Sequence, residues 1–166
     1  MRLLDRAGFD RSWPPVADEA PLPEPPYLVP LDRCLSEPVA TAFGVTLPVD
    51  ADADVLAPVL DRVALVRLTP PGFRDGRIFT QARALRERFG FTGEIVVDGP
   101  VLPDQAAFLA RCGVSTVVLP PGADPAPWHR ALDRFPVAYQ PSVAQEPVLG
   151  GFKRLRNVAD LPPNVD

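Results

Sequence analysis

Residues 94–119, EIVVDGPVLPDQAAFLARCGVSTVVL, decide the fold class. They begin with a short apolar run, continue with a stretch of helical composition that starts at Pro103 and stops at Gly113, and end with a second apolar run. Pro is well tolerated as the first residue of a helix, and Gly is common just beyond its last residue. The order of strand, helix and strand predicts a βαβ unit, in which the two strands are parallel.

The same alternation of apolar runs and helical stretches continues through most of the chain. The expected strands are Gly44–Val49, Val63–Leu68, Glu94–Asp98, Ser115–Leu119 and Val137–Tyr139. Their nearly continuous apolar character is typical of a parallel sheet that is buried on both faces. Because a complete eight-fold barrel needs about 200 residues or more, we predict an α/β fold with a mostly parallel sheet of about five strands, as an open sheet or a half-barrel with flanking helices.

Helices are expected between these strands. In residues 78–89 the apolar side chains recur at helical spacing, and Gly90 follows as a C-cap. A later helix is predicted to start at Asp124–Pro125, an N-cap followed by a first helical position, and to stop at Pro136. The helix expected at Asp54–Asp61 contains a Pro and is short.

The 166 residues have the size of a single domain preceded by an unusual segment. Residues 1–42 contain eight Pro, each of which removes a backbone donor and keeps the preceding residue out of helix. We therefore predict a Pro-rich N-terminal arm that packs on its own domain or on a partner subunit. Residues 43–149 are expected to form the α/β domain, and residues 150–166 a C-terminal tail.

Composition argues against two classes of partner. The formal net charge is −4, whereas nucleic-acid binding is driven largely by Lys and Arg that neutralise phosphates. No stretch approaches the roughly 20 apolar residues of a membrane-spanning helix, and residues 1–10, MRLLDRAGFD, lack the apolar region of a signal peptide. We expect a cytoplasmic protein that binds neither nucleic acid nor membrane.

Cofactor motifs are sparse. Cys34 and Cys112 are the only cysteines, too few for an iron–sulfur cluster or a Cys-rich zinc site, and we expect both to be buried structural thiols. His129, the only histidine, falls in an amphipathic helical segment. Neither a GxGxxG fingerprint nor a Walker A loop occurs, so a standard Rossmann or P-loop nucleotide site is not indicated, and no metal site is expected.

The loops after the strands are the expected place for a ligand, because open α/β sheets bind ligands beyond the carboxyl ends of their strands. In the loop after Leu68, the sequence Asp75-Gly76-Arg77 places a carboxylate and a guanidinium just before a helix. The helix N–H groups, with Arg77 or Arg83, can bind a phosphate, sulfate or carboxylate. The alternative is that Asp75 caps the helix and Arg77 pairs with a neighbouring acid. The candidate anion-binding residues are Asp75, Gly76, Arg77, Arg83, Arg86, Asp98, Asp104 and Gln105.

Residues 73–119 carry a set of motifs in one uninterrupted block. The motifs are Asp75-Gly76-Arg77, Thr80, Ala82-Arg83, Leu85-Arg86, Gly90, Gly93-Glu94, Asp104-Gln105 and Arg111-Cys112-Gly113, with Tyr139-Gln140 further on. In these motifs the chain resembles the bacterial family known as domain of unknown function 934. The chain has Val96, Pro100 and Pro103 where the family commonly has Arg, Asp and Arg. These departures weaken an anion site at the second loop, whereas the Asp75, Arg77, Arg83 and Arg86 set is complete.

The resemblance implies a connection with assimilatory sulfate and sulfite reduction. Members of the family are commonly described as probable oxidoreductases, because their genes lie beside those for sulfite reductase and phosphoadenylylsulfate reductase. One hypothesis is an accessory protein that docks on a sulfur-assimilation reductase and senses an anionic sulfur metabolite through Arg77 and Arg83. A second is an oxidoreductase that uses a diffusible flavin or nicotinamide, with Asp75 and Arg77 positioning the substrate. A third is a structural homodimer that exchanges its Pro-rich arm.

Overall fold

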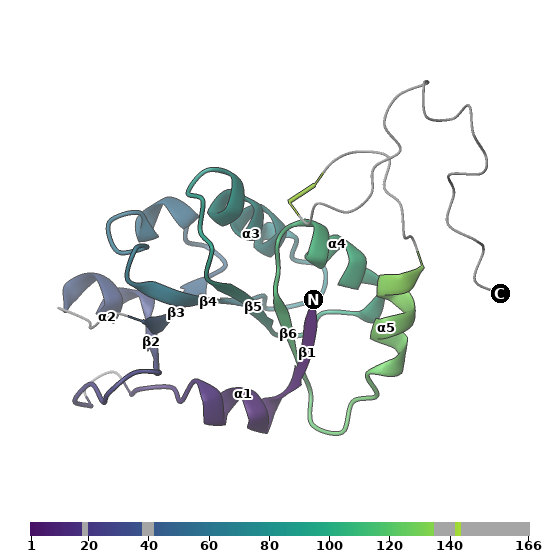
Figure 1. Cartoon of the computed structure of the whole chain (residues 1–166), viewed down its shortest axis with the longest axis horizontal. Helices are drawn as coiled ribbons and strands as arrows, with labels where there is room; N and C mark the ends of the chain where they lie inside the picture. Colours follow the sequence, from purple (N-terminus) through teal and green to yellow (C-terminus); the bar gives the residue numbers. More distant parts are fainter. Residues whose placement is uncertain (18–19, 38–41, 135–141, 144–166) are drawn as a thin grey trace.

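The computed structural model describes residues 1–17, 20–37, 42–134 and 142–143, which form an open β-sheet with helices on both faces (Figure 1). Within these residues the strands are β1 (Arg2–Asp5), β2 (Leu28–Pro30), β3 (Phe43–Pro48), β4 (Val63–Thr69), β5 (Glu94–Asp98) and β6 (Thr116–Leu119). Their order is β1-β6-β5-β4-β3-β2, and all neighbours are parallel. The structure confirms the predicted open parallel sheet with flanking helices.

Four of the six strands lie where the apolar runs predict them, and β5 has the predicted bounds. The other two, β1 and β2, come from residues 1–42, the segment predicted as a Pro-rich arm, and they form the two edges of the sheet. Both are short, and β2 ends in a Pro, so neither has the long apolar run that identifies a strand in a sequence. The strand expected at Val137–Tyr139 lies outside the described residues.

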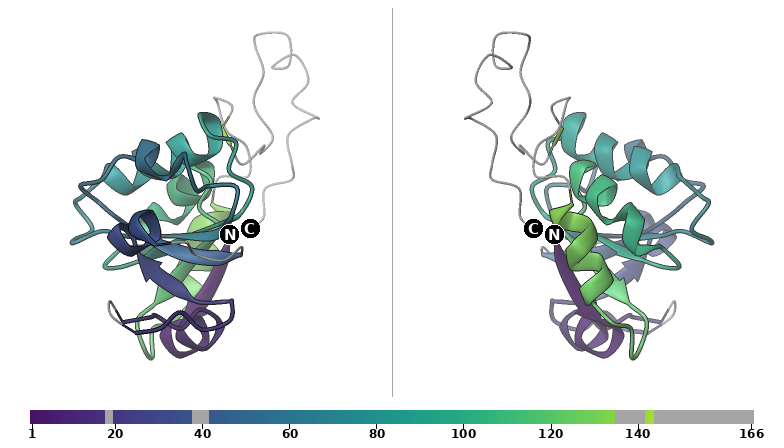
Figure 2. Two further views of the ribbon diagram at one scale, coloured as in Figure 1. Left: turned by 90° about the vertical axis from the view of Figure 1, so that its left-hand side faces the viewer. Right: turned by 90° about the vertical axis from the view of Figure 1, so that its right-hand side faces the viewer.

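The helices divide unequally between the two faces of the sheet. Figures 1 and 2 place α1 (Arg6–Ser12) on the opposite face from α3 and α4. The face opposite α1 carries α2 (Leu31–Ser36), η1 (Ala53–Leu56), α3 (Arg77–Glu87), η2 (Pro103–Gln105), α4 (Ala106–Arg111) and α5 (Ala126–Asp133). The helix expected at Asp54–Asp61 is reduced to the single 3₁₀ turn of η1, because Pro58 lacks the backbone donor that would extend it. None of the helices in the described part of the chain has the length and apolar composition needed to cross a bilayer.

Alternation along the strands builds a hydrophobic core on each face. Val66 and Val97 belong to the larger core beneath α2 to α5, whereas their neighbours Leu65 and Val96 belong to a smaller core beneath α1. The smaller core is completed by Phe9 of α1, which is almost fully buried. Burial on both faces explains why the central strands are nearly continuous apolar runs.

The chain reverses its course at the junction between β1 and β6. After β1 it crosses the sheet through α1 to β2 at the far edge, and then returns strand by strand to β6. The loop after β1 therefore leads to one face, and the loop after the adjacent β6 leads to the other. Two neighbouring strands whose connections diverge in this way form a topological switch point, where open α/β sheets commonly bind ligands.

Candidate functional site

Three charged side chains meet at the carboxyl ends of the central strands, on the face covered by α1. Asp98 ends β5, and its side chain is only 1% exposed. Arg6, the first residue of α1, donates to both oxygens of this carboxylate, while Nη2 of Arg67 on β4 lies 2.7 Å from Oδ2. Hydrogen bonding to Asp98 raises the pKa of Arg6 above its ordinary value.

The contacts of this Arg6–Asp98–Arg67 cluster are mainly structural. The Arg67 guanidinium also lies over the ring of Phe9, 6.0 Å from its centroid, and the buried Nε of Arg67 has no hydrogen-bond partner. Because Arg6 and Phe9 both belong to α1, the cluster holds this short helix on the sheet. The carboxylate is already occupied by two guanidinium groups, so its clearest role is to fasten α1 at the switch point.

The sequence patterns point to Asp98 but not to either arginine. The available signal was Arg67 itself, because a charged residue inside the apolar run VALVRL needs a buried partner. Arg6 carries no comparable signal, since its partner lies 92 positions away in the chain. Only the pairing of β1 with β6 brings Arg6 to Asp98.

Asp75 and Arg77, two of the predicted anion-binding residues, bond to each other across Gly76. Oδ1 of Asp75 accepts from the backbone N–H of Arg77 at 3.1 Å and from its Nε at 3.0 Å, and Nη2 lies 2.7 Å from Oδ2. These bonds from Arg77 lower the pKa of Asp75 below its ordinary value. Gly76 has φ −85°, which any residue adopts. The pairing of Arg77 with a neighbouring acid matches the alternative expectation, whereas the N-cap of α3 is Gly76 and not Asp75.

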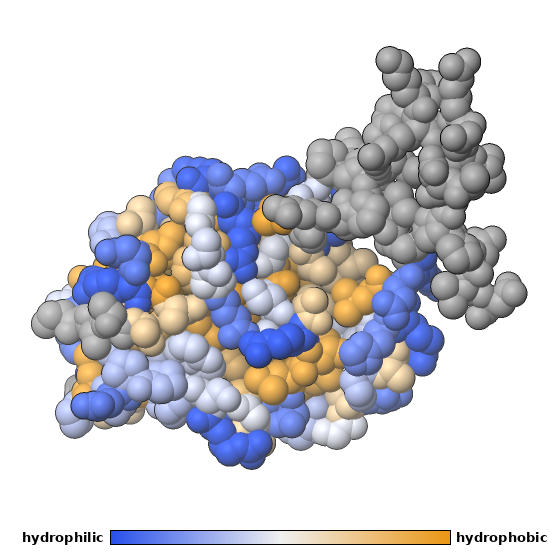
Figure 3. Space-filling model, in the orientation of Figure 1, coloured by the Kyte–Doolittle hydropathy of each residue, from blue (hydrophilic) through white to orange (hydrophobic). Residues whose placement is uncertain are grey.

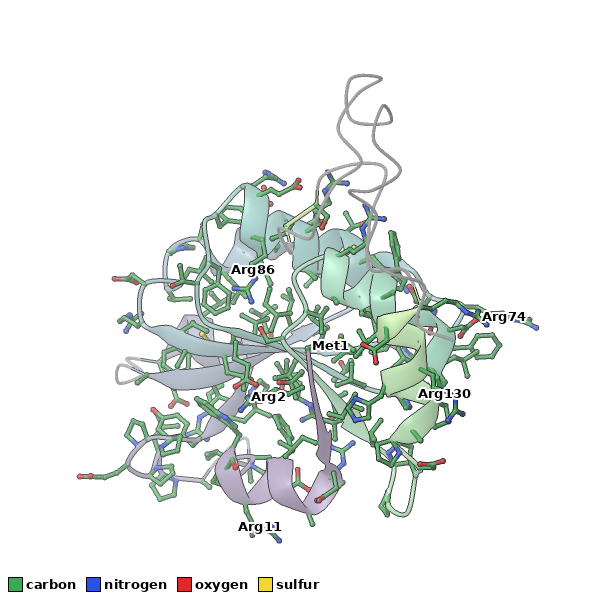
Figure 4. All side chains as sticks on the ribbon, turned by 45° about the vertical axis from the view of Figure 1, so that its right-hand side comes forward. Met1, Arg2, Arg11, Arg74, Arg86 and Arg130 are labelled. Carbon is green, nitrogen blue, oxygen red and sulfur yellow. The ribbon has the colours of Figure 1, made fainter. Side chains whose placement is uncertain are left out.

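Arg86 and Arg83 lie in different surroundings although both belong to α3. Arg86 lies between α3 and the sheet (Figure 4), where its guanidinium donates to three backbone carbonyls and to a hydroxyl. The acceptors are the carbonyls of Phe91, Gly93 and Gly113 and Oγ of Ser115. Burial lowers the pKa of Arg86. Arg83 lies instead on the exposed side of α3, with its Nε 2.8 Å from Oε2 of Glu87.

The last two predicted residues lie in η2. Gln105 accepts from the backbone N–H of Leu102 at 2.9 Å and donates to the carbonyl of Phe73 at 2.9 Å, so it ties the loop after β5 to the loop after β4. Asp104 is exposed in the first turn of η2. The structure thus brings two of the predicted loops together, but it separates Asp75 and Arg77, Arg83, Arg86 and Asp98 into different environments.

A basic pocket of about 540 Å³ lies between α3 and α4, on the side of the helices away from the sheet. The residues of its walls that carry its chemistry are Phe79, Thr80, Arg83, Glu87 and Arg88 from α3 and its C-cap, and Phe108, Arg111 and Cys112 from α4 and its C-cap. Ser142 and Val143 complete the lining. In Figure 3, hydrophilic residues gather along the edge of the molecule formed by α3. Of the predicted residues, only Arg83 contributes to this pocket.

The charge of the pocket lining is predominantly positive. Among the lining residues, Arg83, Arg88 and Arg111 carry guanidinium groups and only Glu87 carries a carboxylate. Arg83 pairs with Glu87, and Arg88 pairs with Asp54 outside the lining, each at 2.8 Å. Such solvent-exposed pairs contribute little free energy, so an anion in the pocket can compete with these carboxylates for the guanidinium donors.

The positive charge of the pocket affects the pKa of Cys112, the buried thiol in its lining. Burial raises the pKa of Cys112, and the guanidinium groups of Arg83 and Arg111 act in the opposite direction. Cys34 and Cys112 are both free and buried, as predicted. His129 is exposed on α5. In the part of the chain that the structure describes, no three His, Cys, Asp or Glu side chains gather in a way that could hold a metal ion.

A comparison with known protein families assigns the chain to one of them. The family model described as "Bacterial protein of unknown function (DUF934)" matches residues 44–149, which is more than half of the chain. The chain belongs to this family. No curated protein matches it. The part matched by DUF934 runs from β3 past α5, and it includes every residue of the basic pocket as well as Arg67 and Asp98. Arg6, with the rest of α1, precedes it.

Proposed function

We propose that this DUF934 protein is an anion-binding accessory protein of assimilatory sulfate and sulfite reduction, acting in the cytoplasm. The observation that carries the proposal is the basic pocket between α3 and α4, with the guanidinium groups of Arg83, Arg88 and Arg111 against the single carboxylate of Glu87. The link to sulfur assimilation comes from the family, whose genes lie beside those of the sulfur reductases.

The donor set of the pocket suits a tetrahedral or pyramidal oxyanion. A guanidinium group presents N–H donors in a planar fork that matches the oxygens of sulfate, sulfite and phosphate. Arg83 comes from α3 and Arg111 from α4, so an anion between the helices meets donors from both walls. The volume of about 540 Å³ lies within the usual range of small-molecule sites.

A binding role fits the state of the thiol in the pocket. Nucleophilic cysteines need a lowered pKa, because the thiolate is the reactive form. In Cys112 burial has the larger effect and raises the pKa, so the group is a protonated thiol at neutral pH. We therefore assign the pocket to recognition of the anion, and we expect the reductive chemistry to belong to a partner reductase.

Calorimetry on the full chain tests the proposal. Sodium sulfate, sulfite and phosphate are titrated at low ionic strength, with sodium chloride as the reference salt. We expect binding of the oxyanions, weakened about tenfold or more in Arg83→Gln and in Arg111→Gln, because charge-assisted hydrogen bonds are lost. Arg130→Gln, at an exposed position of α5 outside the pocket lining, is the matched control and should bind as the natural protein does.

Two outcomes would overturn the assignment. Oxyanions that bind no better than chloride would remove the anion-binding function. Binding that is lost in Arg77→Gln and kept in Arg83→Gln would move the site to the Asp75–Arg77 pair before α3. A direct measurement of association with purified sulfite reductase, with and without sulfate, then tests the accessory role.

A further inference from the structure

Two aromatic rings line the basic pocket, the half-buried Phe79 and the exposed Phe108. The ring of Phe79 on α3 and the ring of Phe108 on α4 lie 4.7 Å apart between centroids, with their planes inclined at 49°. Phe108 remains 54% exposed in spite of this contact. Single exposed hydrophobic side chains are common on protein surfaces, but Phe108 also lines a pocket, where aromatic side chains commonly contact a ligand.

Both walls of the pocket repeat the same order of side chains. On α3, Phe79 is followed four residues later by Arg83, and on α4, Phe108 is followed three residues later by Arg111. Residues three or four apart lie on the same face of a helix, one turn or about 5.4 Å along its axis. Each wall therefore presents an aromatic ring and then, one turn further, a guanidinium group.

The topology of the sheet makes the two helices that form the pocket, α3 and α4, run parallel to each other. α3 and α4 each connect neighbouring parallel strands, β4 to β5 and β5 to β6, so the two helices run in the same direction. The rings of the two helices thus meet at one end of the pocket, as the contact of Phe79 with Phe108 requires. Arg83 and Arg111, each one turn further along its helix, line the same pocket, and both act electrostatically on the thiol of Cys112.

A pocket with an aromatic end and a basic end about one helical turn apart selects a ligand with the same two parts. We propose that the ligand is a nucleotide-type anion, whose base stacks on Phe108 and whose phosphate or sulfate group binds between Arg83 and Arg111. This inference rests on the proposed anion-binding function and specifies its ligand class. The volume of about 540 Å³ is well above the needs of an inorganic oxyanion alone.

All nucleobases can stack on an aromatic ring, so this part of the recognition does not depend on which base the nucleotide carries. Every nucleobase has a π-face, and stacking on an aromatic side chain contributes about 1–3 kcal/mol per base. The oxyanion of a nucleotide adds charge-assisted hydrogen bonds to guanidinium groups. AMP should therefore bind the pocket more tightly than adenosine, which has no anion, and more tightly than sulfate, which has no ring.

Calorimetry with AMP, adenosine and sodium sulfate on the full chain tests the inference. We expect Phe108→Ala to weaken AMP about five- to hundredfold and to weaken sulfate far less than it weakens AMP. Arg83→Gln should weaken both AMP and sulfate. Phe73→Ala is the matched control, because Phe73 is also exposed, at 45%, but does not line the pocket. Since both Phe side chains are exposed, thermal melts should be alike in the two variants.

The outcomes separate this inference from the proposed function. If sulfate binds with dependence on Arg83, but AMP binds no more tightly than sulfate and Phe108→Ala changes nothing, the nucleotide inference is overturned and the anion-binding function stands. If adenosine binds as tightly as AMP, the basic end takes no part and the inference is also overturned. If neither AMP nor sulfate binds, the proposed function fails and the inference fails with it.

Discussion

Nη2 of Arg67 lies 2.7 Å from Oδ2 of Asp98, whose side chain is 1% exposed. Arg67 on β4 is paired in register with Val96 on β5, so Asp98, two residues further along β5, points to the same face of the sheet as Arg67. Arg6 of α1 donates to both oxygens of the same carboxylate. One buried carboxylate thus joins α1 to the central strands.

Replacement of this carboxylate should destabilise the protein strongly. We expect Asp98→Ala to lower the free energy of unfolding by about 3 kcal/mol, because it leaves Arg6 and Arg67 without their shared partner. Urea denaturation followed by circular dichroism measures the difference. Asp104→Ala, at an exposed position of η2, is the control and should lie within about 0.5 kcal/mol of the natural protein. Equal stability of the two variants would contradict the role of the cluster.

We expect Arg86 to contribute to stability and Arg83 to contribute to anion binding. Arg86→Gln should lower the free energy of unfolding by about 2–4 kcal/mol, because its buried carbonyl and hydroxyl partners lose a charged donor. Arg83→Gln should leave stability nearly unchanged, since its pair with Glu87 is exposed. Sulfate affinity should fall in Arg83→Gln and stay nearly unchanged in Arg86→Gln. A stable Arg86→Gln variant with weakened sulfate binding would instead favour the anion site predicted for Arg86.

Two glycines that follow helices provide a matched pair. Gly90 and Gly113 have φ of 60° and 91°, a region that favours glycine. Gly90→Ala should cost about 1 kcal/mol, because an added Cβ meets open space and only the backbone is strained. Gly113→Ala should cost clearly more, since its Cβ would lie 2.5 Å from Cγ of Arg86. Urea denaturation checks both, and equal costs would mean that the Arg86 side chain moves aside freely.

The buried thiols should make stability depend on alkaline pH. Burial raises the pKa of Cys34 and of Cys112, so the folded protein holds these protons more tightly than the unfolded chain does. The resulting stabilisation is present below the ordinary thiol pKa of 9.0 and is lost as the pH rises above it. We expect the free energy of unfolding to fall as the pH rises past the ordinary thiol pKa of 9.0. The double variant C34A/C112A should show a shallower decline, and an unchanged slope would assign the decline to other groups.

The central part of the fold can be predicted because its signals are local. The strand Glu94–Asp98 and the helix from residue 77 onward are marked by short-range apolar patterns and by the glycines that end the helices. The edge strands β1 and β2 carry no such signal. They hold four and three residues, and their hydrogen bonds come from β6 and β3, which are distant in the chain or separated from them by a helix.

Part of the candidate site can likewise be predicted from local sequence, and part cannot. The spacing of Phe79 and Arg83, and of Phe108 and Arg111, is present in the sequence, and each pair shares a helix face by the 3.6-residue period alone. The sequence patterns nevertheless favoured Asp75 and Arg77, because a charged loop before a helix resembles an anion site. The structure instead pairs these two residues with each other.

The class of fold, the central strands and the order of side chains along α3 and α4 can be read from residues that lie close together in the chain. Which polar groups meet depends on how distant segments pack. Parallel crossover connections bring Phe79 to Phe108 and place the arginines of two helices around one pocket, and the pairing of β1 with β6 carries Arg6 to Asp98. The interaction energy of two charged groups depends on their distance in space, and their separation along the chain does not enter it.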